Sequence, residues 1–541
     1  MKHFTITFKP DSIQISVHSG TTLLEAAGRA GIILNSVCGG RGTCKKCTVL
    51  LEPGHRAVCA CQYRIDSDLT VTIPRESRFF GQKIQEGSFE GLVDVKPDVF
   101  RKYQQGDPAK AIFGIAVDLG TTTIVAKLMD MVKGKTLASA AALNPQTRFG
   151  DDVISRITYA RGASEMEQLH KCVIGCLNQL IARLCLDARV EAADVYEMCV
   201  VGNTTMNHIF LKLPIAQLGQ APYEAYSLGA HDLSPPELGL EISPEGNVHT
   251  VENVAGFVGS DTVAVALAVD IGSSDDTTLI VDVGTNGEVV LGSKEALFAA
   301  SCAAGPAFEG ARIACGSRAA EGAIQGVAVE NGEVLLDVID AVQAQSICGS
   351  GLIDAVSVLL QLGVIDRSGR FVRPDQPAES LPPGVAWRVA AAEGQPAFIL
   401  AKGERPVFLS QKDVREAQLA KAAIRTGIKL LQDQLSVQDG DIERVYLAGA
   451  FGNYIDFRSA KTIGLIPDIP IERLRFIGNA AITGAKLSLI SRSSRQLAEH
   501  VAQKVRYVEL TCTPGFNQRY MDATYLPHRD PSRFPSVRLP D

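Results

Sequence analysis

The sequence of 541 residues lacks the features that would place it in a membrane or on a nucleic acid. It contains no uninterrupted apolar stretch of about 18 residues, the length that a helix needs to cross a bilayer. It has no pronounced basic run, and its formal net charge is −7, which disfavours nucleic acid and anionic membrane as partners. Residues 1–8 alternate like a strand and lack the apolar core of a signal peptide. These absences predict a cytoplasmic protein.

The rest of the composition is that of an ordinary globular chain, with 46% hydrophobic and 21% charged residues. Its length is enough for about three or four domain-sized units. The cysteines beyond residue 100 are scattered, as buried free thiols usually are, and a reducing compartment fits them best. Cys302 and Cys348 lie in segments of small residues and are expected to be buried apolar side chains, not ligands.

Cysteine is concentrated instead near the N-terminus. Cys38, Cys44 and Cys47 lie on one Gly-rich loop, and Cys61 follows in the segment Ala-Cys-Gln. Four convergent thiolates suit an iron–sulfur cluster or a zinc ion. The glycines favour iron, because backbone N–H groups must approach the bridging sulfides and a Cβ would keep them away. The zinc alternative, a zinc knuckle, usually pairs two Cys-x2-Cys hooks, and only one such hook exists here.

Regular structure is predicted on both sides of the cysteine loop. Residues 4–8 and 13–17 alternate apolar and polar side chains around a Pro-containing turn, which predicts a β-hairpin. Thr22-Leu-Leu-Glu25 is a capping box that opens a short helix. Residues 48–51 and 69–73 supply later strands. The unit is therefore a small mixed sheet with one helix and one cysteine loop.

This order of elements resembles a β-grasp [2Fe–2S] ferredoxin over residues 1–80. The match departs from plant-type ferredoxins, which place four residues between the first two ligands, whereas five separate Cys38 from Cys44. Cys61 resembles the fourth ligand in its local context, with Cys59 as the competing candidate. The resemblance implies that a [2Fe–2S] cluster is held by Cys38, Cys44, Cys47 and Cys61.

Beyond a predicted linker at residues 81–112, one short motif occurs twice. Asp118-Leu-Gly-Thr-Thr and Asp282-Val-Gly-Thr-Asn each follow an apolar strand and precede a second strand. A single Asp-x-Gly-Thr is weak evidence, because most such sequences are hairpin turns. Two in matching contexts indicate a duplicated domain half.

The motif has a direct chemical interpretation as a phosphate turn. Glycine lets the chain reverse tightly and bring backbone N–H groups against an anion, while threonine hydroxyls add donors. An aspartate at the strand end is suited to hold Mg²⁺ or to orient water, which gives Asp118 and Asp282 catalytic roles. The predicted phosphate-binding residues are Gly120, Thr121, Thr122, Thr123, Gly284, Thr285 and Asn286.

A third element completes the pattern. Residues 444–448 form a predicted strand that leads into a Gly-rich turn suited to lie against an adenosine. A small-residue helix begins near Gly478, and residues 255–261 are a candidate hinge partner for it. This order resembles the actin, sugar-kinase and Hsp70 superfamily of ATPases. The residues predicted to face the nucleoside are Gly449, Ala450, Phe451 and Gly452.

The sequence thus predicts a multidomain α/β and α+β protein. The ferredoxin-like unit at 1–80 precedes two ATPase subdomains, at 113–272 and at 273–541 with a C-terminal tail. The tail from Pro514 is expected to drape over the surface. Asn203, in Gly-Asn-Thr-Thr-Met, either serves a phosphate-rich cleft or only caps its own helix.

A ferredoxin unit fused to an actin-like ATPase resembles the reductive activators of corrinoid-dependent methyltransferase systems. The resemblance covers nearly the whole chain, although only about 30 residues separate the two parts, whereas some members of the family carry a larger segment there. It implies ATP-dependent reduction of cob(II)alamin to cob(I)alamin, with a [2Fe–2S] cluster, ATP and Mg²⁺ as cofactors. It also implies a corrinoid protein and an upstream electron donor as partners, and a possible homodimer.

Two other functions remain open from the sequence. One is a small-molecule kinase that carries a redox sensor, for which Glu288 is the available candidate base near the γ-phosphate. The other is a regulatory module in which nucleotide only gates binding. Phosphoryl transfer to a small molecule would identify the first, and ATP turnover without electron flow would identify the second.

Overall fold

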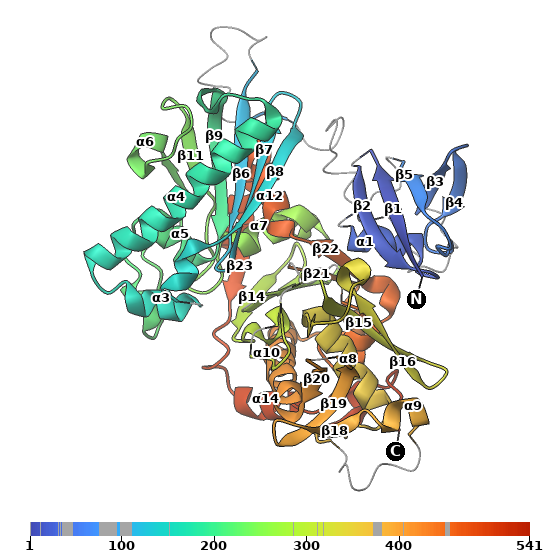
Figure 1. The fold of residues 1–541 in the computed structure, drawn as a ribbon. Helices are drawn as coiled ribbons and strands as arrows, with labels where there is room; N and C mark the ends of the chain where they lie inside the picture. Colours follow the sequence, from blue (N-terminus) through green and yellow to red (C-terminus); the bar gives the residue numbers. More distant parts are fainter. Residues whose placement is uncertain are drawn as a thin grey trace.

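The computed structural model describes most of the chain. The described residues are 2–10, 12–30, 32, 34, 47–74, 95–97, 111–150, 152–284, 286–310, 312–317, 319–371, 381–403, 405–449 and 455–540. Within them the chain forms a small N-terminal head and a larger body with two central sheets (Figure 1).

The head is a five-stranded mixed sheet of strand order β2-β1-β5-β3-β4. Its elements are β1 (His3–Lys9), β2 (Ile13–His18), α1 (Leu23–Arg29), β3 (Thr48–Glu52), β4 (Arg56–Cys59) and β5 (Leu69–Thr72). β1 pairs with β2 as the predicted antiparallel hairpin and with β5 in parallel. The capping box is confirmed, because the Glu25 carboxylate accepts hydrogen bonds from both the backbone N–H and the hydroxyl of Thr22. This is the β-grasp arrangement that the sequence predicts.

The first sheet of the body has the order β10-β11-β9-β6-β7-β8. Its strands are β6 (Phe113–Leu119), β7 (Thr123–Asp130), β8 (Lys135–Leu143), β9 (Val195–Gly202), β10 (His231–Leu233) and β11 (Asn247–Thr250). The second sheet has the order β22-β21-β12-β13-β14-β23. Its strands are β12 (Thr278–Val283), β13 (Gly287–Gly292), β14 (Leu297–Cys302), β21 (Arg444–Ala448), β22 (Leu474–Gly478) and β23 (Val505–Tyr507).

The two sheets repeat one topology. In each, the first strand pairs antiparallel with the second and parallel with a later strand, as β6 does with β7 and β9, and β12 with β13 and β21. The central strands are near-continuous apolar runs, which is typical of strands covered on both faces. The predicted duplication is therefore a duplication of structure.

Helices cover the sheets and the space between them. They are α3 (Val153–Tyr159), α4 (Ala163–Ala188), α5 (Thr204–Phe210), α6 (Pro235–Leu238), α7 (Ser260–Val269), α8 (Gly349–Gln361), α9 (Pro383–Ala386), α10 (Gln411–Leu435), α11 (Phe457–Thr462), α12 (Ala480–Ile490), α13 (Arg492–Lys504) and α14 (Phe516–Ala523). Two three-stranded sheets lie in the second half, formed by β15 (Ala323–Glu330), β16 (Glu333–Val338) and β17 (Ser346–Ile347), and by β18 (Val389–Ala392), β19 (Gln395–Ala401) and β20 (Val407–Ser410).

α7 and α12 share one apolar core with residues from both large sheets. They pack at small residues: a Cβ on Gly484 of α12 would collide with the Ala264 carbonyl oxygen of α7. The predicted pairing of these two segments is confirmed. This helix pair therefore joins the two halves of the body.

One helix in the described part of the chain, α4, is long and apolar enough to cross a membrane by length and composition alone. Its apolar face packs in the core of the first sheet, with Leu169, Leu177 and Leu184 fully or almost fully buried. That is the pattern of a core helix of a folded domain.

The head contacts the body at one described ion pair. His18 Nε2 on β2 lies 2.7 Å from Asp337 Oδ1 on β16, and both side chains are largely buried. The contact sets the head beside the small sheet of β15, β16 and β17 (Figure 1).

The C-terminal tail lies at the surface over much of its length, as expected, but parts of it pack into the body. α14 packs beside α10, and Ala523, Leu526 and Phe534 are buried. The fully buried Lys421 ammonium of α10 donates to the Tyr525 and Pro527 carbonyl oxygens. The tail is thus part of the fold of the second half.

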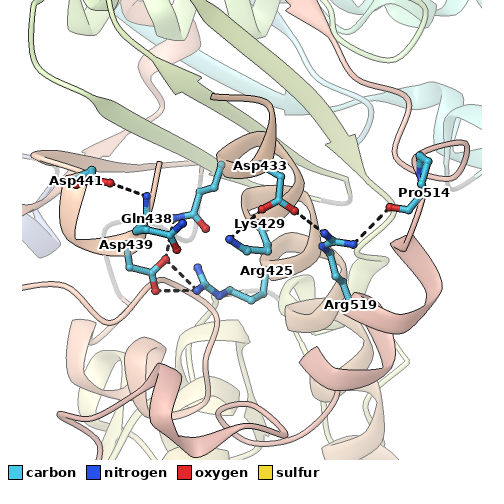
Figure 2. A network of polar contacts seen from close by, with 9 residues as sticks. Arg425, Lys429, Asp433, Gln438, Asp439, Asp441, Pro514 and Arg519 are labelled. Atoms are coloured by element: carbon cyan, nitrogen blue, oxygen red, sulfur yellow. Dashed lines mark hydrogen bonds and ion pairs between the residues drawn. The ribbon is translucent and has the colours of Figure 1, made fainter. Parts of the chain in front are cut away.

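A polar network fixes this end of α10 (Figure 2). The Arg425 guanidinium, almost fully buried, donates to both carboxylate oxygens of Asp439 at 2.8 and 3.1 Å, and the Gln432 amide donates to the same carboxylate at 2.8 Å. Burial opposes ionisation of Asp439, but the Arg425 charge and these bonds hold its pKa below the usual value. Closer to α14, Asp433 lies between Lys429 and Arg519 at more exposed positions.

We expect Asp439→Asn to lower the free energy of unfolding by about 3 kcal/mol at pH 7, because it leaves the Arg425 charge buried without its counter-charge. The difference should be present above pH 3.9, roughly the pKa of an unfolded aspartate, and should vanish as the pH falls through the lower folded-state pKa. Urea unfolding at several pH values measures both. Asp433→Asn is the matched control, with an expected loss of no more than about 1 kcal/mol.

Candidate functional site

The first phosphate turn lies where β6 ends and β7 begins. The Gly120 backbone N–H donates to the Thr123 carbonyl oxygen at 3.0 Å, which closes the turn and leaves Thr121 and Thr122 at its tip. A Cβ on Gly120 would lie 2.5 Å from the same carbonyl oxygen, so only glycine permits this reversal. Asp118 is the penultimate residue of β6, directly before the turn, as predicted.

The second turn lies between β12 and β13 and is one residue shorter than the first, because Val283 pairs with Gly287 whereas Leu119 pairs with Ile124. The Gly284 backbone N–H donates to the Asn286 carbonyl oxygen at 3.1 Å, and Asp282 stands at the end of β12. Thr285 lies outside the described residues, so its predicted phosphate contact remains a prediction.

Side chains from three other segments hold the first turn. The Asn203 amide donates to the Thr121 hydroxyl at 2.8 Å, while the Asn203 carbonyl side-chain oxygen caps α5 by accepting from the Met206 N–H. Asn203 therefore caps its own helix and also binds the first turn, while its role in a phosphate-binding cleft remains a prediction. The fully buried Arg156 donates to the Thr121 carbonyl oxygen at 2.5 Å, and the Asn144 amide donates to that of Gly120 at 2.9 Å.

The two halves meet at Asp118. The Asn479 side chain, which caps α12 in the second half, donates to Asp118 Oδ2 at 2.6 Å. Asn479 follows the strand β22 as Asn203 follows β9, each in a Gly-Asn pair at a helix start. A repeated Gly-Asn after a strand was the signal that could have identified Asn479 as a site residue.

Four carboxylates gather between the two turns. Burial, together with the Asp261 charge, raises the pKa of Asp118 to about 7 against the opposing Asn479 hydrogen bond, and burial with the Asp261 and Asp118 charges raises that of Asp282 to about 7. Burial raises the pKa of Asp261 to about 6. Burial with the charges of Asp261 and Asp282 raises the pKa of Glu288 well above its usual value. Sequence reasoning placed Asp261 in a hinge segment and Glu288 only in the kinase alternative, so it missed half of this group.

A group of carboxylates that repel one another is suited to a hard divalent cation. Mg²⁺ prefers oxygen ligands and is usually held by one or two carboxylates together with substrate phosphates. The oxygens of Asp118 and Asp282, each at the base of a phosphate turn, fit that donor set. The turn N–H groups and hydroxyls beside them fit the phosphates.

The predicted adenosine turn is described only at its start. Gly449 follows β21 with φ of +99°, and a Cβ there would collide with the Val283 carbonyl oxygen and lie 2.8 Å from Asp282 Oδ1. Gly449 thus packs directly against the second phosphate turn. Ala450, Phe451 and Gly452 lie outside the described residues, and their nucleoside contact remains a prediction.

In the head, the structure brings together the two predicted ligands that it describes. The Cys47 thiol, fully buried, interacts with both the backbone N–H and the thiol of Cys61, and burial raises its pKa to about 12. The neighbouring Cys59 also raises the pKa of the Cys47 thiol, by charge repulsion. The loop residues Cys38 and Cys44 lie outside the described residues, so convergence of all four thiols remains a prediction.

Three family models match the chain. They describe a 2Fe-2S iron–sulfur cluster binding domain at residues 6–66, a RACo middle region at 113–290, and the C-terminal ASKHA domain of RACo at 276–538. The first agrees with the β-grasp head, and the other two with the duplicated body.

Curated relatives and a solved structure agree with these models. A corrinoid activation enzyme, RamQ, of Eubacterium limosum is 34% identical over 94% of this chain and 96% of its own. A Co(II) methylated amine-specific corrinoid protein reductase of Methanosarcina barkeri is 26% identical over 76% of each chain. The solved structure of a reductive activator for a corrinoid, iron–sulfur protein is 32% identical, covers 99% of this chain and 100% of its own, and has a TM-score of 0.74.

Proposed function

The chain belongs to the RACo family of reductive activators, and we propose that it uses ATP to reduce the cob(II)alamin of a corrinoid protein to cob(I)alamin in a methyltransferase system. The observation that carries the proposal is the presence, in one chain, of a β-grasp head with adjacent thiols and a body with two facing phosphate turns. The head carries a [2Fe–2S] cluster and the body binds ATP.

The two parts are needed together for an energetic reason. A bound cluster supplies one electron at a time, and plant-type centres lie near about −400 mV. Each ~59 mV by which the cobalt lies below the donor costs a factor of ten in the equilibrium constant of transfer. Nucleotide binding and cleavage offset this cost if they change the complex with the corrinoid protein, as closure of a hinged cleft can.

The roles of individual residues follow from the site. Gly120, Gly284 and their neighbours bind phosphates through backbone N–H groups, with Thr121 held in place by Asn203. Asp118 and Asp282 hold Mg²⁺ and orient water, and Asn479 fixes Asp118 from the other half of the body. Cys38, Cys44, Cys47 and Cys61 supply the cluster thiolates.

Other parts of the proposal rest on the sequence pattern. The domain division at 1–80, 81–112, 113–272 and 273–541 is retained, with the qualification that α12 and α13 of the last part pack beside the first sheet. An upstream electron donor loads the cluster, a homodimer is possible, and the protein acts in the cytoplasm without nucleic acid or membrane.

The direct test mixes reduced protein, Mg-ATP and a corrinoid protein in the cob(II)alamin state under anaerobic conditions. We expect the cob(I)alamin spectrum to appear only when ATP is present. Reduction of equal extent without nucleotide, or no engagement of ATP at all, would contradict the proposal. The redox-sensing kinase and the regulatory module are not favoured, because the curated relatives above are named as an activation enzyme and a reductase.

A further inference from the structure

The two halves of the body differ at the residue that stands opposite the aspartate of each duplicated turn. Across the β6–β7 pair, Asp118 stands opposite Val125, and across β7–β8 Val125 stands opposite Ala141. Across the β12–β13 pair, Asp282 stands opposite Glu288, and across β13–β14 Glu288 stands opposite Ser301. Each row of three residues crosses one face of its sheet, so the same row is apolar after Asp118 in the first half and polar in the second.

The polar row is unfavourable for folding. Two carboxylates directly opposite each other on antiparallel strands bring their Cβ atoms to within about 5 Å and repel. Asp261 is a third carboxylate that repels Glu288. The first half shows that the same strand pairing forms with a valine at this position, so the fold does not require the acid. An acid that the strand pairing does not need is suited to a chemical role.

The described hydrogen bonds of these carboxylates differ in length and donor. Asp118 Oδ2 accepts the Asn479 amide at 2.6 Å, and Asp261 Oδ1 accepts the Thr262 N–H at 2.7 Å in the first turn of α7. Glu288 Oε1 accepts only a long hydrogen bond, 3.3 Å, from the Ser301 hydroxyl among the bonds described for it. Ser301 orients the carboxylate from the neighbouring strand without neutralising it.

We propose that Glu288 is a catalytic residue of ATP cleavage, accepting a hydrogen bond from the attacking water beside the second phosphate turn. The inference rests on the nucleotide cleft proposed above and deepens it. The water oxygen bonds to the γ-phosphorus, the bond from that phosphorus to the bridging oxygen breaks with its electron pair leaving on ADP, and both water protons depart on the phosphate product.

The test is Glu288→Gln, which keeps the size of the side chain and its contact with Ser301 but replaces the carboxyl group by an amide. We expect kcat for ATP hydrolysis to fall by about 10²-fold or more, while the Kd for ATP, the cluster absorbance and the Tm stay within error or improve. A purely structural role would instead lower the Tm and weaken ATP binding. Glu330→Gln on the exposed end of β15 is the matched control and should leave turnover unchanged.

A second variant keeps the proposal falsifiable by an independent route. Ser301→Ala removes the hydroxyl that orients the carboxylate, and we expect kcat to fall about fivefold with ATP affinity retained. If wild-type protein hydrolyses ATP and Glu288→Gln does so within threefold of it, the inference fails and the proposed function stands. If wild-type protein neither binds nor hydrolyses ATP, both fail.

Discussion

Replacing Asp282 with asparagine should abolish ATP-dependent reduction of the corrinoid partner while leaving the iron–sulfur cluster intact. Asparagine has the same shape but cannot supply the charge that a divalent cation and a developing phosphate transition state require. We expect the rate of cobalt reduction to fall by at least about 10²-fold. The fold should tolerate the change, because Asp282 lies among acids that repel it and one charge fewer relieves that repulsion.

The measurement follows the cobalt spectrum after mixing with Mg-ATP, and the cluster absorbance of the same sample. Asp275→Asn is the control: Asp275 precedes the same strand, but its side chain is 79% exposed and pairs only with the surface residue Lys294 among described partners. Loss of cluster absorbance in Asp282→Asn would contradict the assignment of the cluster to the head and of ATP to the body. Unimpaired reduction would remove Asp282 from the site.

Local patterns predicted the parts of the fold that short segments determine. The alternation of residues 4–8 and 13–17 predicted the hairpin of β1 and β2, and Thr22 with Glu25 predicted the capping box. The repeated Asp-x-Gly-Thr predicted a turn at the matching place of each half, and glycine is required at Gly120 because a Cβ there would lie 2.5 Å from the Thr123 carbonyl oxygen.

The missing parts of the candidate site depend on tertiary contacts. Asn479 lies 361 residues from Asp118, and only the packing of α12 between the sheets brings its amide to that carboxylate. Asp261 sits at the start of a helix, where an acidic residue is already explained by the helix dipole. The position of Glu288 opposite Asp282 depends on the strand register, which the sequence alone does not give.

The buried parts of the C-terminal tail were missed for a similar reason. Its proline and arginine content is typical of an exposed segment, but Leu526 and Phe534 within it are buried. The tail is anchored by Lys421, a buried lysine in the middle of α10 whose ammonium has carbonyl acceptors only because the tail supplies them. Neither segment alone predicts the contact.

Replacing Cys61 with serine should remove most of the [2Fe–2S] cluster, whereas replacing Cys59 should not. Both thiols lie near Cys47, but they differ in position. Cys59 ends β4 and stands opposite Thr48 in the ladder, half-buried, while Cys61 is buried in the turn that follows and contacts the Cys47 thiol through both its own thiol and its N–H. A cluster ligand must be deprotonated and share its metal with Cys47, which favours the cysteine already placed against it.

Iron content and visible absorbance of anaerobically purified Cys61→Ser and Cys59→Ser proteins give the comparison. Removal of an outer-shell partner typically costs roughly 10–100-fold in metal affinity. Loss of a direct ligand should cost more, because the serine hydroxyl is a poor substitute for a thiolate. Since ATP binds in the body, both variants should retain ATP hydrolysis. If Cys59→Ser loses the cluster and Cys61→Ser keeps it, the fourth ligand is Cys59, and the turn after β4 must open when the cluster binds.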